Sequence, residues 1–224
     1  SIISILNGSV STVGDARHVT GQYGPHPQRN KFQIKNSVLL YKINNRHESM
    51  LEKLEDGLGD ALQRYPETHF DRNQLPKLKP TFDAARLGLS SISADDVFEH
   101  VLVNTLPQNF PTLYLEGYRG GIEAIHRLFP ALPSLIISSA HGWYSQEVFK
   151  FLAAVTKTHG GRIASMQAGG SNGIYHFFSQ QAHEERISER QFVWGWAEQT
   201  DARKRNAPCF YTSKILVNAA KLKK

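Results

Sequence analysis

A short run of ionisable residues in the last quarter of the chain could carry out proton transfer. The segment QQAHEERISER, Gln181 to Arg190, places His183 directly beside Glu184 and Glu185. A histidine next to a carboxylate can act as a general acid, a general base or an orienting group. The spacing differs from the HExxH pattern of zinc helices, so we expect no metal here. A solvated helix with ion pairs explains the same residues equally well.

A glycine-rich stretch, SMQAGGSNG from Ser165 to Gly173, could receive a ligand. Backbone N–H groups of such turns can hold a phosphate or carboxylate, and Gly169 and Gly170 allow close approach and positive φ. Ala168, just before the glycine pair, can neither donate, accept nor titrate. An ordinary tight turn is the alternative. The substrate-binding candidates here are Gln167, Ala168, Gly169, Gly170, Asn172 and Gly173.

A second candidate loop is SSAHGWYS, Ser138 to Ser145, which offers His141, Tyr144 and Ser145. We take His141 and Ser145 as further substrate-binding candidates. Each of the two loops follows a predicted strand, and ligands of open α/β sheets bind beyond the carboxyl ends of strands. If the strands are parallel neighbours, both loops lie at the same edge of the sheet.

The elements that must position these loops have the pattern of a parallel α/β fold. PSLIISSA (133–140), RIASMQ (162–167) and QFVWGW (191–196) are predicted strands, the first being a continuous apolar run typical of burial on both faces. Between the first two, a helix is predicted with Ser145 as N-cap and Gly160 at its end. Its core face is Val148, Phe149, Leu152 and Val155. This order predicts a βαβ unit in a Rossmann-like α/β lobe.

The first half of the chain has a weaker pattern. The first ~35 residues are predicted to be irregular from their turn-forming residues. A strand (36–43), a helix (47–65, ended by Pro66), an extended connector (69–83) and helices over 93–107 and 115–129 follow. In the 93–107 helix we predict Ser93 as N-cap, a buried stripe of Val97, Val101 and Leu102, and Pro107 as the end. We divide the chain into an N-terminal region, 1–80, and the Rossmann-like lobe, 81–224.

Composition limits the classes of function. The chain has 224 residues, a formal net charge of +6 and one cysteine, Cys209, so an intrachain disulfide and a cysteine-based zinc site are excluded. No apolar run approaches the ~20 residues of a membrane helix. No P-loop, GxSxG or GxGxxG motif is found, and the basic residues form no aromatic-interleaved stripe, so we expect neither cofactor nor nucleic acid. A cytoplasmic location, with peripheral contact to the inner face of a membrane, suits this charge. The start at Ser1 without Met favours a partial or processed chain.

Five blocks in order give a resemblance to a known family. They are P-x-x-YLEGY (111–118), S-x-E-x-FK-x-x-AA (145–154), Q-x-GG-x-x-G (167–173), HE-x-x-IS-[DE]-R (183–190) and F-x-WGW (192–196). With them the chain resembles the transferases of bacterial surface-carbohydrate biosynthesis that act on O-antigen or capsule-type glycans. Residues 1 to ~100 match poorly, so nothing there is taken from the resemblance.

The resemblance implies a nucleotide-sugar-dependent glycosyltransferase with two Rossmann-like lobes, a GT-B-like architecture. More distantly the chain is similar to capsule transferases that use CMP-activated ulosonic acids. The partners implied are a nucleotide-sugar donor and a glycan acceptor. The second lobe would begin after WGW, and only 28 residues follow Trp196. The resemblance therefore implies an acceptor-side lobe ending in a hinge or a truncated second lobe.

The resemblance also implies roles for single residues. His183 and Glu184 would be the acid–base or binding pair, and Glu116 and Glu147 are further catalytic carboxylate candidates. The glycine turn would shape a cleft floor, but the family pattern QHGG reads Gln-Ala-Gly-Gly here. Losing one such transition-state donor typically lowers a rate by about 10²–10³. Either Ala168 is engineered, or the protein is naturally impaired, or this histidine matters less. The alternative function is a non-catalytic lobe that binds a glycan or nucleotide.

Overall fold

The computed structural model describes residues 33–41, 56–63, 65, 67–79, 84–197 and 200–209, together with residues 212, 215 and 218. The irregular region predicted at the start, the first half of the 47–65 helix and the end of the connector lie outside the described residues. Contacts divide the chain into two compact units. Among the described residues, one unit holds 75–124 and the other holds 33–74 and 125–218. The boundary that we predicted near residue 80 stays a prediction.

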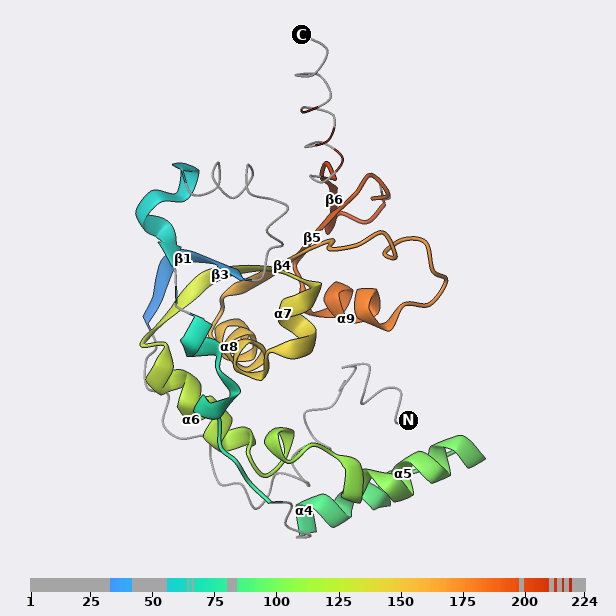
Figure 1. The fold of residues 1–224 in the computed structure, drawn as a ribbon. Helices are drawn as coiled ribbons and strands as arrows, with labels where there is room; N and C mark the ends of the chain where they lie inside the picture. The colour runs from blue at the N-terminus through green and yellow to red at the C-terminus, as the bar shows by residue number, and fades with distance from the viewer. Residues whose placement is uncertain are drawn as a thin grey trace. The chain divides into compact units, whose positions relative to one another are not determined.

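The larger unit is built on a six-stranded parallel sheet with the order β2-β1-β3-β4-β5-β6 (Figure 1). Every neighbouring pair in this sheet is parallel. The strands are β1 (Gln33–Tyr41), β2 (Leu62–Gln63), β3 (Ala131–Ser139), β4 (Arg162–Met166), β5 (Arg190–Val193) and β6 (Lys204–Asn206). The predicted α/β fold with a parallel sheet is therefore confirmed.

The centre of this sheet is the predicted βαβ unit. In β3 and β4, Leu132, Ile136 and Ile163 are buried, as a strand covered on both faces requires. Helix α8 (Glu147–Thr158) connects them and is capped by His159, and Gly160 follows with a φ of 90° that only glycine adopts readily. The predicted core face of α8 is confirmed: Val148, Phe149, Leu152 and Val155 are all buried.

The start of α8 differs from our prediction. A short helix, α7 (Ala140–Ser145), follows β3 directly and includes Ser145 as its last residue. The N-cap of α8 is Gln146, whose side chain makes no capping hydrogen bond. The prediction of Ser145 as N-cap is therefore wrong, because α7 has already taken that residue into a helix.

The two ends of the sheet contain elements that the sequence patterns missed. The helix predicted up to Tyr65 is wrong at its end: Gly59–Ala61 is a 3₁₀ helix and Leu62–Gln63 is β2, which pairs with β1. Gly59 has a φ of 47°, which interrupts a right-handed helix. At the other edge, β5 ends at Val193, because Gly195 turns the chain with a φ of 85°, and the edge strand β6 follows. Helix α9 (Ser179–Ile187) precedes β5 and confirms the helix considered for the HEE segment.

Near β1, one layer of the core is aromatic. Tyr41 stacks on Phe149 with ring centroids 4.5 Å apart and contacts Phe70 at 4.1 Å. Phe70 closes the 3₁₀ helix η3 (Glu67–Phe70), which is followed by η4 (Arg72–Gln74). Phe129 joins the cluster 5.7 Å from Phe70. These rings fill the space between the sheet and α8.

The smaller unit is helical. It contains α4 (Ala84–Leu87), η5 (Gly88–Ser91), α5 (Val97–Asn109), η6 (Thr112–Tyr114) and the first part of α6 (Tyr118–Leu128). The N-cap of α5 is Asp96, whose Oδ1 accepts the Glu99 N–H at 2.8 Å, so our choice of Ser93 is wrong. Pro107 lies inside the last turn of α5 and does not end it.

The predicted buried stripe of α5 is also wrong. Val97 and Val101 are exposed, whereas Glu99, Val103 and Pro107 are the buried residues of the helix. At the end of α5 the buried guanidinium of Arg86 donates to the carbonyl oxygens of Pro107 and Phe110 at 2.7 and 3.0 Å. At its start, Glu99 Oε2 accepts the Asp95 N–H at 2.8 Å.

Candidate functional site

The two candidate loops lie at the same edge of the sheet, as predicted. Ser139, the last residue of β3, is in register with Met166 of β4, and Met166 is in register with Phe192 of β5. Because these strands are parallel, α7, the loop after Met166 and the turn after Val193 all leave from the carboxyl edge (Figure 1). This is the edge at which open α/β sheets bind ligands.

Gln167 holds two of these segments together. Its Oε1 accepts the Trp194 backbone N–H and the Trp196 Nε1–H, both at 2.8 Å, and its Nε2 donates to the Gly169 carbonyl oxygen at 2.7 Å. The side chain is buried. A buried carboxamide oxygen with two partners has both its lone pairs occupied. Gln167 therefore connects the loop after β4 to the turn after β5.

The glycine that the turn requires is Gly173. Its φ is 78°, and a Cβ at this position would lie 2.6 Å from the Trp196 ring. Gly169 and Gly170 are different: neither has a positive φ, and a Cβ on either would meet no atom within 4 Å. Our expectation of positive φ at the glycine pair is therefore wrong. Of the neighbouring candidates, Ala168 is half-buried and Asn172 is buried.

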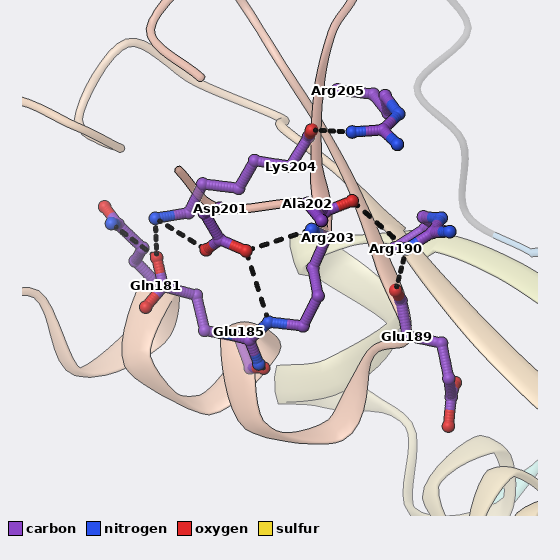
Figure 2. Close-up of polar contacts among 9 residues, drawn as sticks. All are labelled: Gln181, Glu185, Glu189, Arg190, Asp201, Ala202, Arg203, Lys204 and Arg205. Carbon is purple, nitrogen blue, oxygen red and sulfur yellow. Dashed lines mark hydrogen bonds and ion pairs between the residues drawn. The ribbon is translucent and has the colours of Figure 1, made fainter. Parts of the chain in front are cut away.

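Helix α9 closes this arrangement into a ring. The Gly173 N–H donates to Gln181 Oε1 at 2.8 Å, and Gln181 Nε2 donates to Glu185 Oε1 at 2.9 Å. Lys204 of β6 pairs with the same oxygen at 3.1 Å (Figure 2). Its Nζ also lies 5.0 Å from the centroid of the Trp196 ring. We call these residues the edge ring: Gly173, Gln181, Glu185, Lys204 and Trp196.

Charged residues just before β6, together with Arg190 of β5, extend the edge ring. Asp201 accepts from the Arg203 backbone N–H at 3.0 Å and lies 3.6 Å from Lys204 Nζ (Figure 2). Arg203 Nη1 also donates to the carbonyl oxygen of Glu185 at 3.1 Å. Arg190 Nη1 donates to the Ala202 carbonyl oxygen at 3.1 Å. Hydrogen bonds and ion pairs of these charged residues thus connect the edge strand to α9 and β5.

The predicted acid–base pair has two members in different surroundings. Glu184 is 2% exposed, and its Oε1 has no hydrogen-bond partner among the residues that the structure describes. Burial, and then the charge of Glu185, raise the pKa of Glu184 to about 7. Burial lowers the pKa of the adjacent His183, and so do the charges of Lys150 and Arg186. At pH 7 the imidazole is therefore neutral, and the carboxyl group exchanges a proton easily.

Two aromatic residues of α7 complete this cluster. Trp143 meets His183 edge-on, with ring centroids 6.4 Å apart, and its buried Nε1–H has no hydrogen-bond partner within the described part of the chain. The pKa of Tyr144 is raised by burial and by the charge of Glu184, so its phenol stays protonated at any physiological pH. We name His183, Glu184, Trp143 and Tyr144 the acid–base cluster. For the two aromatic residues, the only signal in the sequence was a Trp-Tyr pair just after a predicted buried strand. That signal did not identify Trp143 as a candidate.

The remaining predicted residues belong to α7, α8 and the smaller unit. His141 and Ser145 are in α7, and their side chains lie outside the described set. Glu147 is in the first turn of α8, where a carboxylate interacts favourably with the helix dipole. Glu116 belongs to the smaller unit and forms a two-pronged ion pair with Arg86, both contacts being 2.6 Å. The catalytic roles assigned to Glu116 and Glu147 stay predictions.

The family model described as LIC12162 family transferase matches residues 24–224. The chain belongs to this family. Searches of curated proteins and of solved structures found no match. Membership of the LIC12162 family makes the protein a transferase, and the match extends through residues 24–100, where the five blocks gave no resemblance. None of the described helices of this family member is long and apolar enough to cross a membrane.

Proposed function

We propose that this LIC12162 family member is a nucleotide-sugar-dependent glycosyltransferase whose general base is His183. The observation that carries the proposal is the acid–base cluster at the carboxyl edge of the sheet. There, the pKa of Glu184 is raised to about 7, and the pKa of the adjacent His183 is lowered, which keeps the imidazole unprotonated at neutral pH. A hydroxyl acceptor needs a base that is unprotonated near neutral pH, and such shifts concentrate at functional sites.

The two adjacent residues have different access to a substrate. His183 is exposed whereas Glu184 is buried, so the imidazole is the group that an acceptor can reach. In the proposed step the acceptor oxygen forms a bond to the anomeric carbon of the donor sugar. The bond from that carbon to the donor's phosphate oxygen breaks, and the nucleotide phosphate leaves with its electron pair. The hydroxyl proton passes to the imidazole of His183.

The neighbours of His183 supply the electrostatic part of the proposal. An imidazolium forms as the proton arrives, and the carboxylate form of Glu184 beside it stabilises that charge. The Tyr144 phenol remains a hydrogen-bond donor, because its pKa is raised. It is a candidate donor to the departing phosphate. The resemblance supports a surface-glycan acceptor and a donor such as a CMP-activated ulosonic acid, in the cytoplasm of a bacterium.

Ala168 is the point at which the chain departs from the family pattern. It lies two residues after the end of β4, at the carboxyl edge of the sheet, and its methyl group cannot stabilise a developing charge. If an imidazole at this position contacts the leaving group, Ala168→His raises the rate by about 10²–10³. If it does not, the change leaves the rate as it is and His183 remains the residue to test.

The test is a transfer assay on the chain and on its Ala168→His variant. Each is incubated with CMP- and UDP-activated sugars and an extract of acceptor glycans, and nucleotide release and product mass are followed. His183→Gln should abolish transfer, whereas His100→Gln, at an exposed position of α5, should not. The proposal fails if neither form transfers a sugar with any donor of the panel.

A second candidate is a lobe that binds a nucleotide or glycan without turnover. It is favoured by Gln167 Oε1, whose two acceptor sites are taken by tryptophan N–H groups, and by the apolar Ala168 beside it. A ligand at a concentration of 100 times its Kd would stabilise the fold by ~2.7 kcal/mol. Melting curves that respond to a nucleotide or glycan, with no product in the transfer assay, would support this candidate. Flat curves would exclude it.

A further inference from the structure

The loop that connects Gly173 to α9 carries large apolar side chains in solvent. Ile174, Tyr175 and Phe177 are 76%, 62% and 79% exposed. The loop extends away from the sheet between β4 and α9 (Figure 1, orange). Side chains of these types are usually buried, and a contiguous exposed group of them marks an interaction surface. We call Ile174, Tyr175 and Phe177 the apolar loop.

The sequence around the apolar loop contains no formally charged residue. From Ile163 to His183 there is no Lys, Arg, Asp or Glu, although such residues make up 21% of the chain. At that frequency a stretch of 21 residues would hold about four. The buried strand β4 accounts for only the first few positions of this stretch. An exposed loop that excludes charges is suited to an apolar medium, because transferring a charge into such a medium is costly.

The base of the apolar loop is held in place by the edge ring. Gly173 donates to Gln181 at 2.8 Å on one side of the loop, and its backbone lies against Trp196. The Ile174 N–H donates to the Ser171 carbonyl oxygen at 3.3 Å, and the rings of Tyr175 and Phe178 lie 5.9 Å apart. With its base fixed, the loop presents Ile174 and Phe177 outward.

We propose that the apolar loop inserts into the interfacial region of an anionic lipid bilayer. The inference is independent of the proposed transfer reaction. Ile174 and Phe177 have no polar group with which to recognise a sugar. Apolar side chains of this kind are suited to the boundary between lipid headgroups and acyl chains. Tyr175 and His176, between them, are of the amphipathic type that lies at the headgroup level.

The positive charge of the chain fits an anionic surface. Lys150 and Arg186 lie close enough to His183 to lower its pKa, and His183 is on the helix that the loop enters. The chain as a whole carries +6. Anionic lipids attract a basic surface by about 1 kcal/mol per Lys or Arg at the headgroups, which combines with the apolar insertion. Insertion would bring the start of α9, and with it the acid–base cluster, to the membrane surface.

The test is flotation of the chain with vesicles of phosphatidylcholine and phosphatidylglycerol in a 3:1 ratio, beside vesicles of phosphatidylcholine alone. The chain should float with the anionic vesicles and less with the neutral ones. Ile174→Ser/Phe177→Ser should reduce the bound fraction at least about tenfold, given the transfer free energy of the two side chains. The matched control is Val97→Ser/Phe98→Ser on α5, where the exposures are 80% and 73%. This control should bind like the wild type.

Three results would overturn the proposal. The first is a wild-type chain that floats with neither vesicle. The second is an equal loss of binding in both double variants, which would indicate non-specific hydrophobic adsorption. The third is a dimer, seen by light scattering, that only the loop variant disrupts while flotation is unchanged; the occupant would then be a second copy. All substituted side chains are exposed, so equal melting temperatures will show that folding is unaffected. None of these measurements uses the transfer assay. Failure of the membrane proposal can therefore be distinguished from failure of the proposed reaction.

Discussion

Helix α9 presents two sets of side chains that differ in how well their polar groups are paired. Gln181 and Glu185, four residues apart on one face, are tied into the edge ring by Gly173 and Lys204. Glu184, one position from that face, leaves Oε1 buried and without a hydrogen bond among the described residues. A paired network makes a segment rigid, whereas a buried unpaired group costs stability and needs a reason. We therefore expect the edge ring to support the helix, and we propose that the acid–base cluster carries the proton transfer.

The largest effect should come from a substitution in the acid–base cluster. His183→Gln removes the proposed base, so we expect kcat/KM to fall by about 10²–10⁴ with the melting temperature unchanged. The pKa of His183 is lowered, so wild-type activity should fall only when the pH drops below the ordinary histidine range. Initial rates of nucleotide release from pH 5 to 8 will measure the fall in kcat/KM and the pH dependence. If His183→Gln shows the same loss of activity at low pH as the wild type, His183 is not the group that titrates.

Glu184→Gln should change the pH dependence of stability. The pKa of Glu184 in the folded state is about 7, above its ordinary value of 4.5, so burial favours the protonated form. Its contribution to stability is complete below pH 4.5 and is lost as the pH rises to about 7. The loss amounts to about 3 kcal/mol. Urea unfolding between pH 4 and 8 should show this decline in the wild type and not in Glu184→Gln. Parallel curves would contradict the buried, unpaired state of the carboxyl group.

On the paired side, a single methyl group should disturb the edge ring. Gly173→Ala places a Cβ against the Trp196 ring at a φ of 78°, so we expect a loss of about 1–3 kcal/mol in the free energy of unfolding. The matched control is Gly170→Ala, whose Cβ meets no atom within 4 Å. The control should unfold like the wild type in denaturant titrations. Equal losses in the two variants would show that Trp196 does not set the requirement at 173.

The smallest effect should come from the ion pair of the edge ring. Lys204→Met removes the contacts with Glu185 and the Trp196 ring, and partly buried pairs of this kind contribute about 1 kcal/mol or less. The loss should shrink in 1 M salt, because screening weakens the wild-type pair. Arg205→Met is the control, because Arg205 Nη1 donates to the backbone carbonyl oxygen of Lys204 and not to a side chain of the edge ring. A salt-independent loss would mean that packing, not charge, is what Lys204 supplies.

The central part of the fold could be predicted because its signals are local. The apolar run of β3 and the helical spacing of Val148, Phe149 and Leu152 each lie within a few residues. The short strands β2 and β6 could not be predicted, since two or three residues carry no periodic pattern and gain their hydrogen bonds only from a neighbouring strand. Val97 and Val101 were assigned to the core by period alone, whereas the buried residues of α5 are Glu99, Val103 and Pro107.

The candidate site was predictable in its main residues and not in its partners. His183 and Glu184 stand out because a histidine beside carboxylates is visible in the sequence. The pKa of His183 depends on burial, Lys150 and Arg186, and that of Glu184 depends on burial and Glu185. The burial and the proximity of Lys150 are not visible from spacing alone. The glycine turn was misjudged for the same reason. The residue that needs to be glycine is determined by Trp196, 23 positions further along the chain.

The contact between Gly173 and Trp196 has a consequence for how this family can change over time. Trp196 donates to Gln167 and also occupies the space that a side chain at 173 would need. Positions 167, 173 and 196 should therefore be inherited as one unit. In relatives that lack the tryptophan, the glutamine loses an N–H partner and position 173 loses its steric restriction, while its backbone still favours Gly, Asn or Asp. Substitutions at these three positions should occur together along a lineage rather than one at a time.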